Sequence, residues 1–250
     1  MPNRKVLITG ASSGLGAALA RAHAGPGVTL VLWGRNQERL DMTALQCGAL
    51  GAAIRTDGFD LRDIDALIAR LKSCEAEAPI DLAIFCAGMG GTVPADQFAE
   101  APEIARAMAE VNFCSPVVGA SFLSGVMAKR GRGQIILIGS IAESFPLPMA
   151  AVYAGTKAGL AMFAEALALR MAPHHVAVTL VSPGFIDTPM SRQVTEAKPF
   201  LMTADRAAQI IARKSLRRPL RIVVPWQFAV IRLFANLVPR PVLRLILRRA

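Results

Sequence analysis

Seven short apolar segments alternate with segments of helical pattern along this chain, and that alternation restricts its fold more than any other feature. The apolar segments span residues 5–10, 28–36, 52–60, 80–88, 133–140, 176–184 and 220–225. Helical spacing of apolar side chains lies between them, at about 15–24, 39–50, 64–73, 102–129 and 150–171. Strands that are apolar throughout and are separated by helices form a parallel sheet covered on both faces. The sequence therefore predicts a doubly wound α/β domain of three layers.

The chain length of 250 residues suits one such domain and is short for two. We assign residues 1–224 to this domain and residues 225–250 to a basic amphipathic helical tail. Although 53% of the residues are hydrophobic, no uncharged apolar stretch reaches the roughly 18 residues of a spanning helix. The N-terminus lacks the apolar run of a signal peptide. The four cysteines are scattered, so we expect a cytoplasmic protein without a metal site or disulfide framework.

The positive charge is concentrated near the C-terminus. Ten of the 28 basic residues lie beyond residue 212, whereas all 18 acidic residues precede residue 206. The first 212 residues therefore carry as many basic as acidic side chains, and the net charge of +10 belongs to the end of the chain. A neutral body argues against a nucleic-acid surface, and the tail lacks the interleaved aromatic residues of a base-stacking site.

Three glycines stand between the first apolar segment and the first helical pattern. Gly10, Gly14 and Gly16 lie in the stretch TGASSGLG. Glycine allows a sharp turn and close approach to a ligand, and the following helix N-terminus attracts phosphate. A glycine triplet alone often marks only a turn. Its place at the first strand–helix junction favours a dinucleotide site in a Rossmann-type sheet.

The end of the second apolar segment bears on the choice of dinucleotide. An acidic residue at this point would hydrogen-bond the ribose 2′-hydroxyl of NAD. The chain has WGRN here, with no carboxylate, and Arg35 is available to a 2′-phosphate. We therefore favour NADP(H) over NAD(H); the alternative is that Arg35 is an ordinary solvated arginine.

The only tyrosine of the chain, Tyr153, precedes Lys157 by four residues. Residues at this spacing share one face of a helix. A tyrosine has an ordinary pKa near 10, and a nearby ammonium lowers it by favouring the phenolate. The pair could therefore move a proton near neutral pH. The alternative is a surface tyrosine and a solvated lysine on an ordinary helix.

Taken together, these motifs resemble the short-chain dehydrogenase/reductases. Six motifs follow one another in the order and spacing of that family: TGASSGLG, CAG at 86–88, Asn112, Ser140, YAGTK and SPGFIDTPM. Ser140 precedes Tyr153 by 13 residues, as it does there. The resemblance covers about residues 4–224.

The resemblance implies catalytic roles for four residues. Tyr153 would exchange a proton with the substrate oxygen, and Ser140 would hydrogen-bond that oxygen. Lys157 would lower the pKa of Tyr153 and hold the nicotinamide ribose. Asn112 would support a water and proton relay to Lys157.

The resemblance also implies contacts with cofactor and substrate. Besides the three glycines, Arg35, Tyr153 and Lys157, the cofactor contacts would be Ser12, Ser13, Leu15, Asp60, Leu61, Ala87, Gly88, Pro183, Gly184, Ile186 and Thr188. Substrate contacts are expected at Ser140, Glu143, Phe145, Met149 and Met190. For Glu143, a carboxylate at the rim that meets only water is the other interpretation. The apolar members of this set favour a hydrophobic substrate, although Met and Phe side chains more often belong to a core.

One motif departs from the family. The stretch NNAG of the family is FCAG here, and Phe85 stands in place of the asparagine that usually braces the sheet. We expect a structural compensation rather than a loss of activity.

The tail has a basic and an apolar face. Arg240, Arg244 and Arg248 are four residues apart, and Pro225 and Pro241 can each open a helix. Basic amphipathic helices with Trp, Phe and Leu often lie on anionic membranes. Packing of the tail against the domain or a second subunit is the alternative, and the two can hold together.

These observations predict an NADP(H)-dependent oxidoreductase that interconverts a ketone or aldehyde and an alcohol, on a hydrophobic or lipid-like substrate. The family pairs subunits through the helix that carries Tyr153, so we expect a homodimer or homotetramer. The alternative function is a non-catalytic, membrane-associated NADP- or lipid-binding scaffold or sensor with the same fold.

Overall fold

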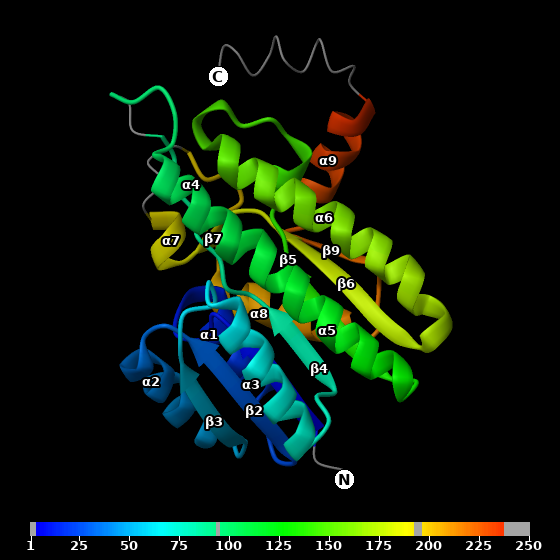
Figure 1. Cartoon of the computed structure of the whole chain (residues 1–250). Coiled ribbons are helices and arrows are strands. Elements are labelled where there is room, and N and C mark those ends of the chain that lie inside the picture. The colour runs from blue at the N-terminus through cyan, green and yellow to red at the C-terminus, as the bar shows by residue number, and fades with distance from the viewer. Residues whose placement is uncertain (1–3, 94–95, 193–196, 238–250) are drawn as a thin grey trace.

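A seven-stranded parallel sheet forms the centre of the molecule in the computed structural model, which describes residues 4–93, 96–192 and 197–237 (Figure 1). The strand order is β3-β2-β1-β4-β5-β6-β9, so the chain starts in the middle and winds outward in both directions. The strands are β1 (Arg4–Thr9), β2 (Val28–Gly34), β3 (Ala53–Gly58), β4 (Leu82–Phe85), β5 (Gly133–Ile138), β6 (Val176–Pro183) and β9 (Arg221–Val224). All seven predicted strands are present, and the predicted α/β fold class is confirmed.

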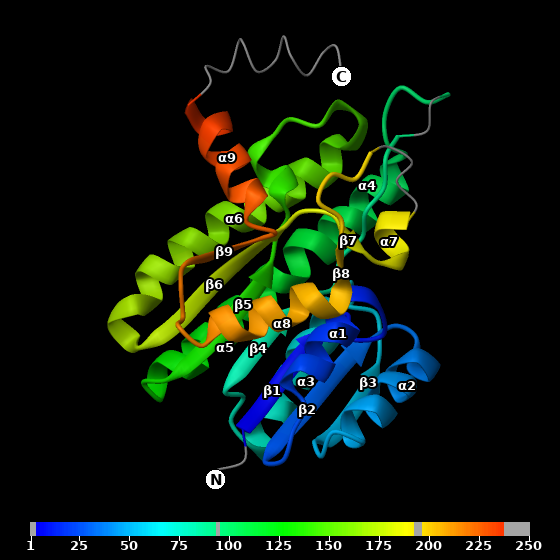
Figure 2. The same ribbon diagram turned by 180° about the vertical axis from the view of Figure 1, so that it is seen from behind.

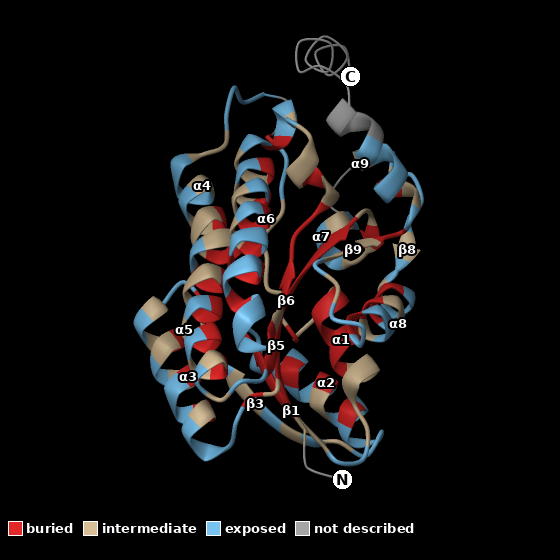
Figure 3. Cartoon of the chain, turned by 90° about the vertical axis from the view of Figure 1, so that its right-hand side faces the viewer, coloured by how far each residue is buried: buried red, intermediate tan, exposed pale blue. Residues whose placement is uncertain are grey.

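Helices cover both faces of this sheet (Figures 1 and 2). One face carries α3 (Ile64–Glu77), α4 (Pro102–Ala109), α5 (Ser115–Lys129) and α6 (Ala151–Met171). The other carries α1 (Gly14–His23), α2 (Gln37–Gly48) and α8 (Ala204–Ser215). Two apolar cores result, and β1 contributes to both, since Leu7 faces one core while Val6 and Ile8 face the other. Figure 3 shows the buried residues on the sheet and on the inner sides of these helices.

Several short elements complete the chain. A π-helical turn (Glu110–Cys114) joins α4 to α5, and short 3₁₀ turns span Ile141–Ser144, Pro148–Ala150 and Ala172–His174. A two-stranded sheet that the sequence did not predict pairs β7 (Ile186–Asp187) with β8 (Met202–Thr203), and α7 (Pro189–Arg192) follows β7. After β9, Pro225 precedes α9 (Gln227–Leu237). The second tail helix predicted at Pro241 lies outside the described residues.

The substitution at Phe85 has its compensation in α5. Phe85 is buried at the end of β4, and its ring packs against Gly119 of that helix. A Cβ at position 119 would lie 2.5 Å from the ring, so the large side chain on the strand requires glycine on the helix. An aromatic–glycine contact thus joins β4 to α5 where the family has an asparagine.

The helical stretch Pro102–Lys129 has the length and mean hydropathy, 1.4, of a membrane-spanning helix. Half of its most apolar window is buried within the fold, and α5 contacts both α3 and α6. A core helix of this kind meets the same criteria, so the stretch carries no argument for a membrane span.

Candidate active site

The predicted site residues gather at the carboxyl edge of the sheet. Because the strands are parallel, β1, β4, β5 and β6 all end there, and the residues after them are Gly10, Cys86, Gly139 and Gly184. Ligands of open α/β sheets bind outside this edge, where the strand order reverses. The reversal lies between β1 and β4, beside the glycine turn.

The glycine turn is shaped for a phosphate. Gly10 has φ +71°, and a Cβ on Gly16 would lie 2.2 Å from the Gly10 carbonyl oxygen, so α1 can start directly on the turn only with glycine at both positions. The first turn of α1 holds no acidic residue, and the Ser13 side chain makes no capping hydrogen bond. The first N–H groups of α1 and the positive end of its dipole are therefore available to an anion. A dinucleotide pyrophosphate fits this cradle.

The residues predicted for the adenosine half lie after β2 and β3. Arg35 is exposed, and Ser12 lies against Gly34 at the end of β2. Asp60 accepts hydrogen bonds from the backbone and guanidinium of Arg62. These bonds lower the pKa of Asp60, and the charge of Arg35 adds to the effect. Leu61 is buried in the core.

Ser140, Tyr153 and Lys157 come together at the end of β5. Ser140 is buried, and its Oγ accepts a hydrogen bond from the backbone N–H of Ala142 (3.1 Å). Lys157 is buried on α6 and donates from Nζ to the Ile138 carbonyl oxygen at 2.9 Å. The Nζ atom lies 5.8 Å from the centre of the Tyr153 ring. The three side chains can thus reach one substrate oxygen and one neighbouring ribose.

The expectation that Lys157 lowers the pKa of Tyr153 is not met in this structure. Burial raises that pKa, hydrogen bonding with the Ser140 hydroxyl opposes the rise, and the negative charge of Glu143 adds to it. The ammonium of Lys157 is directed at the end of β5 and is itself desolvated: burial lowers the pKa of Lys157 to about 8. In this state Ser140 is the group that favours the phenolate.

Asn112 lies in the π-helical turn and is completely buried. Its side chain accepts from the Met89 backbone N–H at 2.7 Å, and donates to the Met89 carbonyl oxygen at 2.8 Å and to Thr156 Oγ1 at 3.3 Å. A Cβ built on Gly88 would lie between Asn112 Oδ1 and Lys157 Nζ, 3.3 and 3.7 Å from them. Asn112 therefore ties the segment after β4 to α6 next to Lys157. π-helical turns inside longer helices often mark functional positions.

The segment after β6 lies over this edge of the sheet. Pro183 ends β6, Ile186 begins β7, and Thr188 contacts Gly14 of the glycine turn. Met190 of α7 lies against Gly88 and Gly90, with its sulfur 2.9 Å from a Cβ built on Gly90. Residues 183–190 thus touch both the phosphate turn and the segment that follows β4.

The other apolar residues predicted for the substrate lie beside the segment that follows β4. The Met149 carbonyl oxygen accepts from the Val93 N–H at 2.8 Å, which brings residues 145–149 next to that segment. Met149 and Met190 are exposed, whereas Phe145 is half-buried. The segments that carry Met149 and Met190 therefore both lie beside the segment that follows β4.

The alternative interpretation of Glu143, a rim carboxylate that meets only water, is wrong, and its expected contact with the substrate stays a prediction. Its side chain is only 3% exposed and forms an ion pair with Arg221 of β9. Its Oε1 also accepts from Ser182 Oγ at 2.8 Å. Glu143 follows Ser140 by one turn, and no local pattern indicates that a basic residue 78 positions later would meet it.

Thr9 was also missed. Its hydroxyl oxygen accepts from the backbone N–H groups of Cys86 and Ala87, at 3.1 and 3.2 Å, and so fixes the end of β4 beside the glycine turn. A hydroxyl residue at the last position of a buried strand, just before the glycines, is the signal that could have identified it.

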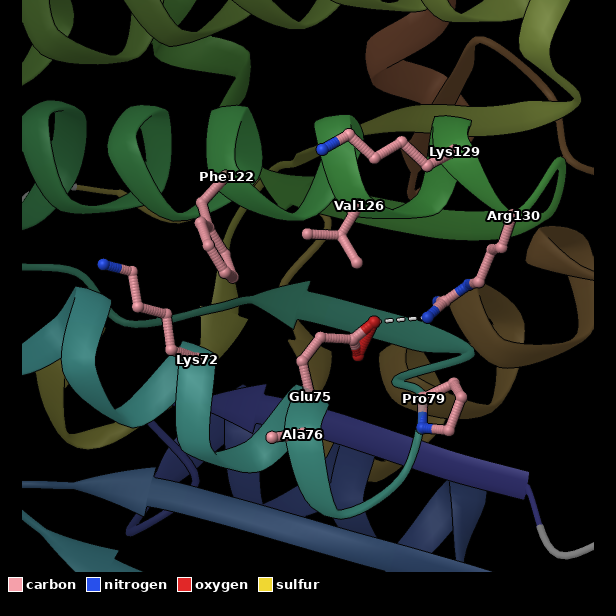
Figure 4. A pocket seen from close by; sticks show the side chains of 8 residues that line it. All are labelled: Lys72, Glu75, Ala76, Pro79, Phe122, Val126, Lys129 and Arg130. Atoms are coloured by element: carbon pink, nitrogen blue, oxygen red, sulfur yellow. Dashed lines mark hydrogen bonds and ion pairs between the residues drawn. The ribbon is translucent and has the colours of Figure 1, made fainter.

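A shallow pocket of about 480 Å³ lies elsewhere, between α3 and α5 (Figure 4). The pocket is lined by Glu75 and Arg130, which form an ion pair, and by Lys72 and Lys129. These residues belong to the ends of α3 and α5 that precede β4 and β5, at the amino edge of the sheet. The pocket is therefore separate from the site described above.

Burial of Lys157 gives a pH-dependent stability. Its folded-state pKa of about 8 lies below the ordinary value of 10.5. Below pH 8 the lysine is protonated in both the folded and the unfolded state, so the full cost of burying an ammonium applies. Between pH 8 and 10.5 the folded state gives up its proton first, and the cost falls. We expect Lys157→Met to raise the free energy of unfolding near pH 7 by up to roughly 3 kcal/mol, and this gain to shrink toward pH 10.

Urea unfolding without added cofactor, over a series of pH values, measures this difference. Lys72→Met, at an exposed position on α3, is the matched control and should show no such dependence. The lowered pKa of Lys157 would be contradicted if Lys157→Met were no more stable than wild type at pH 7. It would also be contradicted if the difference in free energy of unfolding were the same at every pH.

Comparison with known proteins agrees with this geometry. A family model for the short chain dehydrogenases matches residues 4–199. An uncharacterized oxidoreductase of Myxococcus xanthus is 31% identical over 250 residues, which cover 100% of this chain and 98% of that protein. A short-chain dehydrogenase from Sphingobium yanoikuyae, solved in complex with NADPH, superposes with a TM-score of 0.82 at 27% identity and covers 91% of this chain and 92% of its own.

The bulky-bulky ketone specific alcohol dehydrogenase from Comamonas testosteroni superposes with a TM-score of 0.77 at 26% identity, over 89% of this chain and 86% of that chain. The resemblance seen in the sequence motifs is thereby confirmed. This chain belongs to the short-chain dehydrogenase family and is an oxidoreductase that acts on CH–OH groups with a nicotinamide nucleotide as cofactor.

Proposed function

We propose that the enzyme is an NADP(H)-dependent oxidoreductase that interconverts the carbonyl of a hydrophobic ketone or aldehyde and the corresponding alcohol. The observation that carries this proposal is the convergence of Ser140, Tyr153 and Lys157 at the end of β5, next to Asn112 and to the open N-terminus of α1. The exposed apolar side chains of Met149 and Met190 at the border of the site support a hydrophobic substrate.

The four residues divide the proton chemistry. Tyr153 gives its phenolic proton to the substrate oxygen during reduction and takes it back during oxidation. Ser140 donates a hydrogen bond to the same oxygen. Lys157 binds the ribose, and Asn112 holds the segment after β4 and a water that leads to Lys157. The bound cofactor supplies or accepts the hydride.

The residues that would hold the cofactor divide into three groups. The pyrophosphate would be held by the turn after β1, at Gly10, Ser12, Ser13, Gly14, Leu15 and Gly16. The adenosine half would be held by Arg35, Asp60 and Leu61. The nicotinamide half would be held by the residues after β4 and β6, namely Ala87, Gly88, Pro183, Gly184, Ile186 and Thr188. A scaffold without activity would have no need for the four chemical groups beside such a cradle, in agreement with the family's oxidoreductase activity.

The preference for NADP(H) rests on Arg35. This exposed guanidinium follows β2, where an NAD enzyme of this fold would have a carboxylate. The relative from Sphingobium yanoikuyae was solved with NADPH, which supports the same choice.

Replacement of Arg35 by Ala is expected to weaken NADPH binding roughly 10- to 100-fold, because one charge-assisted contact with a phosphate is lost. Binding of NADH should stay within about twofold, since NADH has no 2′-phosphate. Calorimetric titration of both cofactors measures the two dissociation constants. Arg39→Ala, at an exposed position on α2, is the control. Equal affinity of the wild type for both cofactors would refute the preference, and failure to bind either would favour the scaffold.

The hydrophobic substrate class rests on the residues around the mouth of the site. Met149, Met190, Phe200 and Leu201 are all exposed large apolar residues, and they belong to segments that meet at the carboxyl edge. The Comamonas testosteroni relative is a bulky-bulky ketone specific alcohol dehydrogenase, which supports a bulky ketone as substrate. Long-chain ketones are the first substrates to test.

We further propose that α9 and the tail hold the enzyme on the inner face of an anionic membrane. Phe228 of α9 is buried against Gly184 and packs edge-on to Phe185 and Phe200, so the helix starts next to the mouth of the site. Trp226, directly before α9, is 66% exposed, and Val230 and Leu233 of the helix are exposed four and seven residues later. Apolar residues at this spacing, with basic residues beyond them, suit a lipid interface.

The chain contains two tryptophans, and Trp33 is buried in the core, so Trp226 alone can report contact with lipid. We expect its fluorescence to shift to the blue with vesicles containing phosphatidylserine. Trp226→Ser should weaken vesicle binding, measured by sedimentation, about tenfold. Leu45→Ser, an exposed apolar residue on α2, is the matched control. No binding of the wild type to these vesicles would leave subunit packing as the role of the tail.

We also propose that the enzyme is a homodimer or homotetramer that pairs through α6. The outer side of this helix exposes a row of small and apolar residues: Gly155, Ala158, Met162, Ala166 and Leu169. Light scattering of the purified protein determines the number of subunits, and a monomer at micromolar concentration would refute the proposal.

A further inference from the structure

A buried acidic residue stands directly behind Ser140. Glu143 lies in the 3₁₀ turn Ile141–Ser144, and its backbone N–H donates to the Ser140 carbonyl oxygen at 3.1 Å. Its side chain turns inward, where Oε1 meets Ser182 of β6 and Arg221 of β9. Arg221 also donates to Ser182 Oγ at 3.1 Å. The turn that carries Ser140 is thus fastened to two neighbouring strands by one carboxylate.

Packing alone does not explain this carboxylate. Oε2 is buried and has no hydrogen-bond partner among the described residues. It lies 2.8 Å from a Cβ built on Gly139, so the glycine before Ser140 makes the space for it. Burying a charge whose hydrogen bonds are only half satisfied is costly, and apolar side chains usually fill such a space at less cost. A functional reason for the charge is therefore to be expected.

The catalytic groups lie within the field of this carboxylate. The charged and titratable groups that face Glu143 are Arg221 of β9, Arg232 of α9, and Tyr153 and Lys157 of α6. Glu165 of α6 lies on the far side of Arg221, at 3.8 Å, and is largely exposed. Negative charge near a phenol disfavours its ionisation, and near an ammonium it favours the charged form.

We propose that Glu143 is a positioning residue: through Arg221 and Ser182 it fixes the turn that carries Ser140, and through its charge it keeps Tyr153 in the proton-donating form. The inference rests on the proposed role of Tyr153 as the proton donor. Its functional consequence is that carbonyl reduction, which starts from the protonated phenol, continues to higher pH.

The shifts in pKa have the signs that this role requires. The carboxylate of Glu143 adds to the burial that raises the pKa of Tyr153. It also opposes the burial that lowers the pKa of Lys157. Glu143 therefore helps to maintain a neutral phenol beside a protonated lysine.

The single tyrosine of the chain allows a direct test. The absorbance of the phenolate, followed over an alkaline pH titration, reports Tyr153 alone and needs neither cofactor nor substrate. We expect Glu143→Gln to move the midpoint to lower pH, because a negative charge near the phenol is removed. Glu165→Gln is the matched control: it removes a carboxylate from the other side of Arg221 and should leave the midpoint unchanged. A Glu143→Gln midpoint equal to or above that of wild type would overturn the proposal.

A second variant separates this effect from damage to the fold. Arg221→Gln removes the positive partner and should move the midpoint to higher pH, whereas partial unfolding would expose Tyr153 and lower the midpoint in both variants. Circular dichroism at each pH shows the range over which each variant is folded. Downward shifts in both variants would overturn the proposal.

Kinetics provides the readout for the positioning role. In Glu143→Gln the alkaline limb of carbonyl reduction should move to lower pH, and kcat should fall about tenfold with the cofactor Kd unchanged. The optical titration does not depend on turnover, so its failure leaves the proposed function standing. Absence of NADPH and NADH binding in the calorimetric titration would instead contradict the proposed function. An unchanged kcat in Glu143→Gln would overturn the positioning role.

Discussion

The common direction of the seven strands is the constraint on which the whole site depends. Because the strands are parallel, the ends of β1, β4, β5 and β6 meet at one edge, and residues far apart in sequence become neighbours there. Gly10 and Ala87, for example, approach so closely that a Cβ on the glycine would lie 2.7 Å from the Ala87 Cα atom. The phosphate turn and the catalytic groups are therefore held by the rigid sheet rather than by loops alone.

Desolvation is the second physical effect that shapes the site. Burial alone drives Tyr153 and Lys157 toward their neutral forms, with a raised pKa for the phenol and a pKa of about 8 for the amine. The surrounding hydrogen bonds and charges then act in opposite directions on the phenol, with Ser140 favouring its ionisation and Glu143 opposing it. The pKa of Tyr153 thus depends on a balance between one hydroxyl, that of Ser140, and one buried carboxylate, that of Glu143.

Local pattern was enough to predict all seven strands and the long helix that carries Tyr153 and Lys157 at neighbouring positions, whereas the place of Ser140 beside them was predicted from the family resemblance. Pairing across long sequence distances could not be predicted: the partner of Glu143 is Arg221, and the contact that compensates Phe85 is Gly119. The sign of the Tyr153 shift was also missed, because spacing on a helix indicates which residues share a face but not where Lys157 Nζ points or how much water is excluded. Such properties depend on the packed tertiary structure.

The central claim is that the Tyr153 hydroxyl passes the proton, and removal of that hydroxyl alone tests it most directly. Tyr153→Phe should bind NADPH with an affinity within about twofold of wild type, since the ring and Lys157 remain. Its kcat for NADPH oxidation by a long-chain ketone, monitored by absorbance, should fall by roughly 10²- to 10⁴-fold, as expected for the loss of a general acid. Turnover close to that of wild type in a variant that binds NADPH normally would contradict the account.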